Sequence, residues 1–469
     1  MRSRKFFVLL GFLTALSFIL GSHTAQSLDQ TRGWHSANQI GPGTMTGPIV
    51  VTTDLRTERL SIGSFYEPYA IMVKQGGLLI GDVLTQEKPQ SSIPKGNLVN
   101  TIDSNGNSGL SNSIIIGNDG LPVISYFEKT NGDLKFLKCI NQKCSSVFNN
   151  LSTLDRSGNV GNYSSIIIGP NGFPTIAYYD DTNKKIKILL CNDEICNTYS
   201  ISTIDSATTD VGRYMSMTIH YRFADSQGFP MIVSQANTPL YGKVLHVLYC
   251  ASQNCFLMGG VIYDYTGGNR DSGYYPSVAM GVDNLPIVAF IDIGNLQLKV
   301  LKCTIDDCYT GGIVTTLESL VTSQSATSIA IGNDGLPVIS FINNGKLKLY
   351  KCSNIDCTAG WSRILDTVTN AFYFAPISIG PDGFPAIAYS DFNNGAVKLY
   401  KCWNINCTSG TTTTLATESP GIVPVDISMT TGTDGNPIIS YHIDNTFSSG
   451  SLKVIKCGSP GCLPYWTRR

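Results

Sequence analysis

The sequence has little charge, and neither sign dominates. Asp, Glu, Lys and Arg make up 14% of the 469 residues, and the formal net charge is -1. A nucleic-acid-binding surface needs clustered Lys and Arg. We therefore expect no nucleic-acid partner.

Long apolar runs are also missing, except for FFVLLGFLTALSFIL over residues 6–20. This run follows the basic residues MRSRK and precedes small residues, with Ala25 and Ser27 placed for cleavage before Leu28. The pattern predicts a signal peptide over 1–27. An uncleaved anchor is the alternative, although the run is short for a bilayer span. We expect a secreted, extracellular or cell-surface protein, or a periplasmic one, with no membrane span after cleavage.

No cysteine is left unpaired, because the chain's 14 Cys form seven C-x4-C pairs. The pairs are Cys139 and Cys144, Cys191 and Cys196, Cys250 and Cys255, Cys303 and Cys308, Cys352 and Cys357, Cys402 and Cys407, and Cys457 and Cys462. Zinc half-sites are the competing interpretation. The pairs recur once per repeat with no His beside them, so an exported chain favours a disulfide within each pair. No metal or other cofactor is expected.

Each cysteine pair ends a repeat of about fifty residues. A turn such as NDGLP (118–122) or PDGFP (381–385) joins two apolar runs, which is a hairpin signal. The fourth turn, VDNLP (282–286), has Asn284 in place of Gly, and Asn tolerates positive φ. After each Pro, apolar side chains alternate with small ones, so the second strand should be packed on both faces.

Seven repeats of four strands predict an all-β fold, a seven-bladed β-propeller over 98–469. The last repeat ends too early for a fourth strand, while LVNTID (98–103) matches the fourth strands LSTLD (151–155) and ISTID (201–205). We expect this N-terminal strand to close the ring. Residues 28–97 alternate like strands without a repeat and predict a small β-rich extension of unknown role.

The repeat resembles that of secreted bacterial β-propellers of the broad sialidase/BNR-like group, in units of the form DGxPxIxYxD…LK…C over roughly 98–462. Such propellers serve many functions. The Asp-box S-x-D-x-G-x-x-W is absent, and Arg213, Arg222, Arg270 and Arg363 form no evident cluster. We assign no catalytic residues and expect that the chain is not an enzyme.

A basic residue stands four positions before the first cysteine of every pair: Lys135, Lys187, His246, Lys299, Lys348, Lys398 and Lys453. A ring of cations is one interpretation. We favour ion pairs across the hairpin with Glu128, Asp180, Asp292 and Asp391, and a polar contact with Asn343.

Function is expected on the face opposite the cysteines, because binding residues sit on loops held by a rigid scaffold. Aromatic and polar side chains that suit a sugar ring or a protein surface gather in the loops between repeats. The candidate ligand-binding residues are Tyr163, Arg213, Tyr214, Asn269, Arg270, Asp271, Tyr274, Tyr275, Phe372, Tyr373 and Phe374. The alternative is that these aromatics fold inward and plug the channel.

The sequence thus predicts a non-enzymatic binding module for a glycan or an extracellular protein. A sialidase-like glycoside hydrolase with a site at the channel mouth, and a structural envelope protein, are the alternatives. The sequence does not indicate an oligomeric state.

Mass spectrometry of the non-reduced protein tests the cysteine assignment. Peptides linked within each C-x4-C pair are expected. Free thiols in most pairs, or bound zinc, would contradict the disulfide assignment.

Overall fold

The computed structural model describes residues 49–51, 70–74, 77–81 and 96–463, except 146–148, 205–209, 222–227, 256–257, 264–270, 310, 320, 322–324, 368–373, 420–421 and 447–448. The chain divides into two compact units, 1–93 and 94–469. The predicted signal peptide lies outside the described residues. No helix among the described residues is long and apolar enough to cross a membrane.

The described part of the first unit is one antiparallel sheet. Its strands β1 (Ile49–Val51), β2 (Ala70–Lys74) and β3 (Gly77–Gly81) lie in the order β1-β3-β2.

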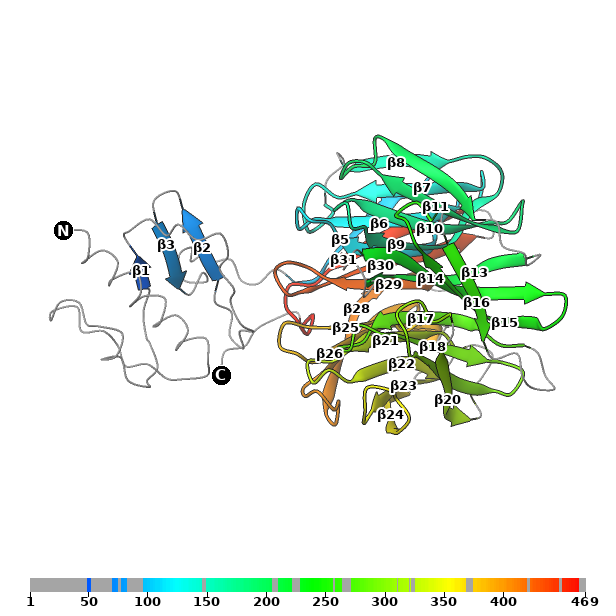
Figure 1. Ribbon diagram of the computed structural model, residues 1–469. Helices are drawn as coiled ribbons and strands as arrows, with labels where there is room; N and C mark the ends of the chain where they lie inside the picture. The colour runs from blue at the N-terminus through cyan, green and yellow to red at the C-terminus, as the bar shows by residue number, and fades with distance from the viewer. Residues whose placement is uncertain are drawn as a thin grey trace, which may run out of the picture. The chain divides into compact units, whose positions relative to one another are not determined.

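The second unit is a seven-bladed β-propeller of four-stranded antiparallel sheets (Figure 1), as the sequence predicted. Blade 1 contains β5 (Ser108–Ile116), β6 (Pro122–Glu128), β7 (Asp133–Lys138) and β8 (Asn150–Asp155); blade 2 β9 (Val160–Ile168), β10 (Pro174–Asp180), β11 (Lys185–Cys191) and β12 (Tyr199–Ile204); blade 3 β13 (Asp210–Tyr221), β14 (Gly228–Thr238), β15 (Gly242–Cys250) and β16 (Met258–Tyr263). Blade 4 contains β17 (Tyr274–Met280), β18 (Pro286–Asp292), β19 (Gln297–Cys303) and β20 (Gly312–Ser319); blade 5 β21 (Thr327–Ile331), β22 (Pro337–Asn343), β23 (Lys346–Cys352) and β24 (Gly360–Thr367). Blade 6 contains β25 (Ile377–Ile379), β26 (Pro385–Asp391), β27 (Ala396–Cys402) and β28 (Gly410–Thr417), with the 3-10 turn η3 (Phe392–Asn394) after β26.

Blade 7 combines the two ends of the propeller sequence. Its strands are β29 (Val423–Thr431), β30 (Pro437–Thr446), β31 (Ser449–Lys456) and β4 (Leu98–Asp103), in that order. The strand β4 runs antiparallel to β31, with Leu98 opposite Lys456 and Asp103 opposite Leu452.

The second strand of each blade is buried on both faces because the blades pack against one another. In β6, Ile124, Ser125 and Tyr126 are all fully buried, which confirms the tight packing inferred from the alternation. The preceding turns are also as predicted, since Gly120 and Asn284 both have positive φ, at 79° and 58°.

All seven C-x4-C pairs form disulfides, with Cα–Cα distances between 4.6 Å and 5.0 Å. In blades 1 to 6 each bridge lies in the loop between the third and fourth strands, and in blade 7 it directly follows the third strand, β31. Consecutive strands are antiparallel, so these loops share one face of the propeller with the turns between strands one and two. We call this the disulfide face. The opposite face, which carries the connections between blades, is the linker face.

The disulfide face also holds five buried lysines that the sequence analysis did not single out. Each lysine directly precedes the first cysteine of a pair and forms an ion pair with the Asp of the turn between strands one and two. The pairs are Lys138 with Asp119, Lys302 with Asp283, Lys351 with Asp334, Lys401 with Asp382 and Lys456 with Asp434. The N–O distances lie between 2.6 Å and 2.8 Å. The same aspartates cap the turns, as Asp119 does for the N–H of Leu121. This double use explains why Asp recurs in the turn.

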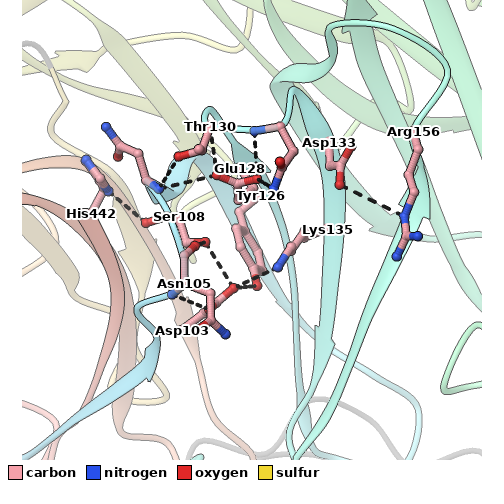
Figure 2. Close-up of polar contacts among 12 residues, drawn as sticks. Asp103, Asn105, Ser108, Tyr126, Glu128, Thr130, Asp133, Lys135, Arg156 and His442 are labelled. Atoms are coloured by element: carbon pink, nitrogen blue, oxygen red, sulfur yellow. Dashed lines mark hydrogen bonds and ion pairs between the residues drawn. The ribbon is translucent and has the colours of Figure 1, made fainter. Parts of the chain in front are cut away.

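A second polar cluster connects neighbouring blades nearer the linker face (Figure 2). The Asp103 carboxylate of blade 7 accepts hydrogen bonds from the Tyr126 hydroxyl at 2.7 Å and the Ser108 hydroxyl at 3.0 Å, and pairs with Lys135 at 3.3 Å. Burial alone would raise the pKa of Asp103, but the hydrogen bonds of Tyr126 and Asn105 and the charge of Lys135 outweigh it and lower the pKa.

Equivalent clusters recur between other blades. The hydroxyl of Tyr178 donates to Asp155 at 2.8 Å, and that of Tyr441 donates to Glu418 at 2.8 Å. In both cases the carboxylate lies at or just beyond the end of the preceding blade's fourth strand. The sequence analysis had not assigned these carboxylates a role.

The lysine ring is therefore paired, in part with partners that differ from those predicted. Lys187, Lys299 and Lys398 contact the predicted Asp180, Asp292 and Asp391. Instead of the predicted residues of their own hairpins, Lys135 and Lys348 pair with Asp103 and Glu318 of the preceding blade. Lys453 pairs with Glu418, also of the preceding blade. The remaining member, His246, is buried, which lowers its pKa to about 4. This ring offers no free cations for an anion.

Replacing Asp103 by Ala should lower the free energy of unfolding by about 3 kcal/mol, because Tyr126 and Lys135 would lose their acceptor inside the protein. Since the pKa of Asp103 is lowered in the folded state, its contribution is present at neutral pH and lost as the pH falls through the folded value. Urea denaturation at several pH values measures both effects.

The control variant is Asp181→Ala, which breaks the exposed ion pair between Asp181 and Lys184. It should cost less than about 0.5 kcal/mol. Equal losses in the two variants would contradict the importance assigned to the buried cluster.

Candidate functional site at the mouth of the central channel

The first strand of four blades begins with a glycine that is pressed against the preceding blade. Gly109, Gly161, Gly212 and Gly273 have φ of 105°, 108°, 111° and 75°. A Cβ on Gly161 would lie 2.8 Å from the Cα of Leu134, and one on Gly109 would lie 2.8 Å from the Cα of Leu452. Glycine is therefore required here by both φ and close approach.

Two residues after each of these glycines, a non-glycine residue also has a positive φ. Ser111, Tyr163, Tyr214 and Tyr275 have φ between 46° and 55°, and Asp426 of blade 7 has φ of 48°. The pairing register with the second strand shifts at these positions. Each is a β-bulge, in which the extra residue re-aims its side chain.

This conformation costs a non-glycine residue about 1–2 kcal/mol. Three tyrosines in equivalent positions of adjacent blades are costly for the fold, since a glycine would adopt the same φ without strain. The strain points to a role for the side chains.

The bulges surround a pocket of about 200 Å³ at the linker-face end of the central channel. Every blade contributes three consecutive residues: 111–113, 163–165, 214–216, 275–277, 326–328, 374–376 and 426–428.

A belt of serines directly after the bulges holds this ring together. The Oγ atoms of Ser113, Ser216, Ser277, Ser328 and Ser428 accept hydrogen bonds from backbone N–H groups of the next blade, at distances between 3.1 Å and 3.3 Å. These bonds fix the first strands around the channel and thereby the pocket's shape.

Aromatic side chains form one wall of the pocket. The ring of Tyr214 lies 4.7 Å from that of Tyr163 and 4.2 Å from that of Tyr275, measured between centroids. The Phe374 ring contacts Tyr275 edge-on at 5.9 Å. All four side chains are half-buried. Burial and the neighbouring Tyr214 raise the pKa of Tyr163, so its hydroxyl stays neutral.

Polar groups from blades 1 and 7 line another part of the pocket. The Asp426 carboxylate accepts the backbone N–H of Ser111 at 2.8 Å, and the Asn112 side chain donates to the Asp426 carbonyl. The Ser111 hydroxyl donates to Asn162 at 2.7 Å. Among the described residues that line the pocket, Asp426 is the only one with a carboxylate, and none is Lys, Arg or His.

Burial raises the pKa of Asp426, and the Ser111 N–H and the charge of His442 oppose that rise only partly. His442 is itself buried, which lowers its pKa, while Asp426 and Asp444 act in the opposite direction and Lys129 adds to the lowering. The His442 ring nitrogen Nδ1 lies 2.9 Å from the Ser108 carbonyl (Figure 2). Within the described part of the chain, the Asp426 carboxylate therefore has no strong cationic partner.

The structure brings four of the predicted ligand-binding residues together in the pocket: Tyr163, Tyr214, Tyr275 and Phe374. They lie at the channel, as the alternative interpretation had it, yet they leave a hollow rather than a plug. Asn269, Arg270, Phe372 and Tyr373 lie outside the described residues.

Three predicted residues do not line the pocket and are engaged elsewhere. Arg213 pairs with Asp210 at 3.2 Å and packs over the Tyr179 ring. The Tyr274 hydroxyl donates to Asp271 at 2.9 Å, and Asp271 also pairs with Lys243 at 3.1 Å. These contacts place them behind or beside the pocket lining.

Sequence analysis missed Ser111, Asn112 and Asp426. A signal was present: Gly-x-Tyr recurs as GNY (161–163), GRY (212–214) and GYY (273–275), and GLS (109–111) is its counterpart in blade 1. Asp426 lacks the glycine, so only its distance to the turn glycine, Gly432, marks it. Among the described residues, no group of three or more His, Cys, Asp or Glu is arranged to hold a metal ion.

The sequence matches no protein-family profile and no curated protein. In fold, the chain is similar to a protein of unknown function from Dyadobacter fermentans, with a TM-score of 0.42 at 10% identity, over 77% of this chain and 98% of that one. It is also similar to an α-L-arabinofuranosidase from Fusarium graminearum (TM-score 0.46, 8% identity, 62% and 92% covered). A third similar structure is the NanB sialidase from Streptococcus pneumoniae (TM-score 0.44, 11% identity, 81% and 74% covered). At these identities the likeness concerns the propeller fold alone.

Replacing Asp426 by Asn should raise the free energy of unfolding at neutral pH by about 1 kcal/mol. Gains of this size are common when a functional residue that destabilises the fold is replaced. The raised folded-state pKa means that ionised Asp426 opposes folding at neutral pH. This penalty fades as the pH falls through the folded pKa, so the two proteins should converge in acid. Thermal unfolding across pH measures the difference.

The variant Asp103→Asn is the matched comparison, because the lowered pKa of Asp103 predicts a loss of stability at neutral pH. If Asp426→Asn also destabilised the protein at neutral pH, the pocket carboxylate would be structural.

Proposed function

We propose that this protein is a non-enzymatic binding module that recognises a glycan through the pocket at the channel mouth on its linker face. The observation that carries the proposal is the aromatic wall of Tyr163, Tyr214 and Tyr275, each held in a left-handed conformation that costs stability. Aromatic faces beside polar groups suit a sugar ring, which has apolar C–H faces and a polar edge.

The proposed location is outside the cell. Seven disulfides support it, because such bonds persist in oxidising compartments. The apolar run at residues 6–20 also supports a location outside the cell, because it has the pattern of a signal peptide. Clips on every blade would resist fraying in such surroundings.

The hydrolase alternative gains less support from the pocket. Glycoside hydrolysis ordinarily uses two carboxyl groups that flank the scissile bond. Only Asp426 is available among the described lining residues. Sialidases are an exception because they use a Tyr nucleophile, but the described lining has no Glu to activate a tyrosine and no Arg to bind the carboxylate of an acidic sugar. Nearby carboxylates such as Asp103 and Asp155 are engaged with Tyr and Lys between the blades. A purely structural envelope protein, in turn, would have no use for strained tyrosines around a hollow.

A glycan-array screen of residues 28–469, followed by calorimetry on the best hit, tests the proposal. Tyr275→Ala should weaken binding at least tenfold, which corresponds to about 1.4 kcal/mol, because it removes the centre of the aromatic wall. Tyr275→Gly has the same loss of ring but relieves the strained φ, so it separates lost contacts from misfolding.

The control is Tyr309→Ala, which removes an exposed tyrosine near a disulfide, Cys303–Cys308, on the opposite face. It should bind like the wild type. Loss of binding in Tyr309→Ala but not in Tyr275→Ala would place the site on the disulfide face and contradict the proposed pocket. An array without hits would favour a protein partner over a glycan.

A further inference from the structure

The charge of the pocket narrows the class of ligand. Its lining combines one carboxylate, Asp426, with three tyrosines and a phenylalanine, and the described lining residues include no cation. The faces of aromatic rings carry negative potential. Both walls of the pocket therefore favour a positive group over a negative one.

Among the described residues, two cations near the aromatic wall are paired with acidic partners of their own. Arg213 pairs with Asp210 at 3.2 Å, and Lys243 pairs with Asp271 at 3.1 Å. Neither lines the pocket. The described residue that faces Asp426 with a titratable base is His442, whose lowered pKa keeps it neutral at neutral pH. Among the described residues, an acidic sugar would thus meet Asp426 without a compensating cation, and like charges in a partly buried site repel strongly.

Asp426 and the aromatic wall line the same pocket. The Asp426 carboxylate is close enough to Tyr163 to raise its pKa further, together with burial and Tyr214. The Asp426 carboxylate accepts one hydrogen bond, from the backbone N–H of Ser111 at 2.8 Å. A half-buried carboxylate in this setting gains from a cationic partner supplied from outside.

Resting on the proposed glycan-binding function, we propose that the pocket binds a protonated amine of an amino sugar, with the ammonium between Asp426 and the rings of Tyr163, Tyr214 and Tyr275. The carboxylate supplies an ion pair and the rings supply cation–π attraction. The sugar ring that carries the amine lies against the aromatic wall.

Titration calorimetry at neutral pH with three matched glucosamine tetramers tests the inference. One tetramer has free amines, the second is N-acetylated, and the third is N-trimethylated and keeps its charge at every pH. The two cationic tetramers should bind at least tenfold more tightly than the acetylated one. Asp426→Asn should abolish this preference, whereas Tyr275→Ala should weaken binding of all three.

The matched control is Asp181→Asn, which removes a carboxylate on the same face that pairs with Lys184 at 2.7 Å outside the pocket. The preference for cationic tetramers should survive in this variant. If Asp181→Asn reduced the preference as much as Asp426→Asn, general surface charge would explain it and the inference would be wrong.

The failure of this inference can be told apart from failure of the proposed function. A neutral or acidic glycan that binds equally well to wild type and Asp426→Asn, but not to Tyr275→Ala, would overturn the amine and leave the binding module. Absence of binding to every glycan on the array and to all three tetramers would overturn both.

Discussion

The close approach of each blade's first strand to the preceding blade is the constraint on which the rest of the structure depends. Glycines such as Gly161 leave no room for a Cβ against the preceding blade, and the serine hydroxyls accept N–H groups of the following one. These contacts set the radius of the ring. Three of these glycines stand two residues before the bulge residues Tyr163, Tyr214 and Tyr275, which line the pocket. The fold and the candidate site therefore have one origin.

Three buried or half-buried carboxylates of this protein, Asp103, Asp155 and Asp426, fall into two kinds by their surroundings. Asp103 and Asp155 receive hydrogen bonds from tyrosines and pair with lysines, and their pKa values are lowered below the ordinary range. Asp426 receives one backbone N–H and has a raised pKa. The first kind connects blades, whereas the second is held ready in a pocket. Environment, rather than residue type, separates the structural acids from the candidate functional one.

The sequence analysis identified the propeller because each repeat contains short-range signals that specify local structure. A turn with Asp and Gly, a strand that alternates large and small side chains, and a cysteine pair each specify short-range structure. Four of its candidate residues, Tyr163, Tyr214, Tyr275 and Phe374, lie around the pocket. Arg213 and Tyr274 do not line the pocket and contact Asp210 and Asp271, partners that the sequence pattern does not reveal.

The sequence by itself determined the number of blades, the disulfide pairing and the face on which variable residues gather. These follow from contacts within one repeat, which are separated by few residues. Only the tertiary structure decided the partners of the lysines and the lining of the pocket. Lys135 meets Asp103 and Ser111 meets Asp426 through the packing of one blade on the next, and the latter pair is 315 residues apart in the chain. Contacts between blades depend on the curvature and twist of the whole ring, which no single repeat encodes.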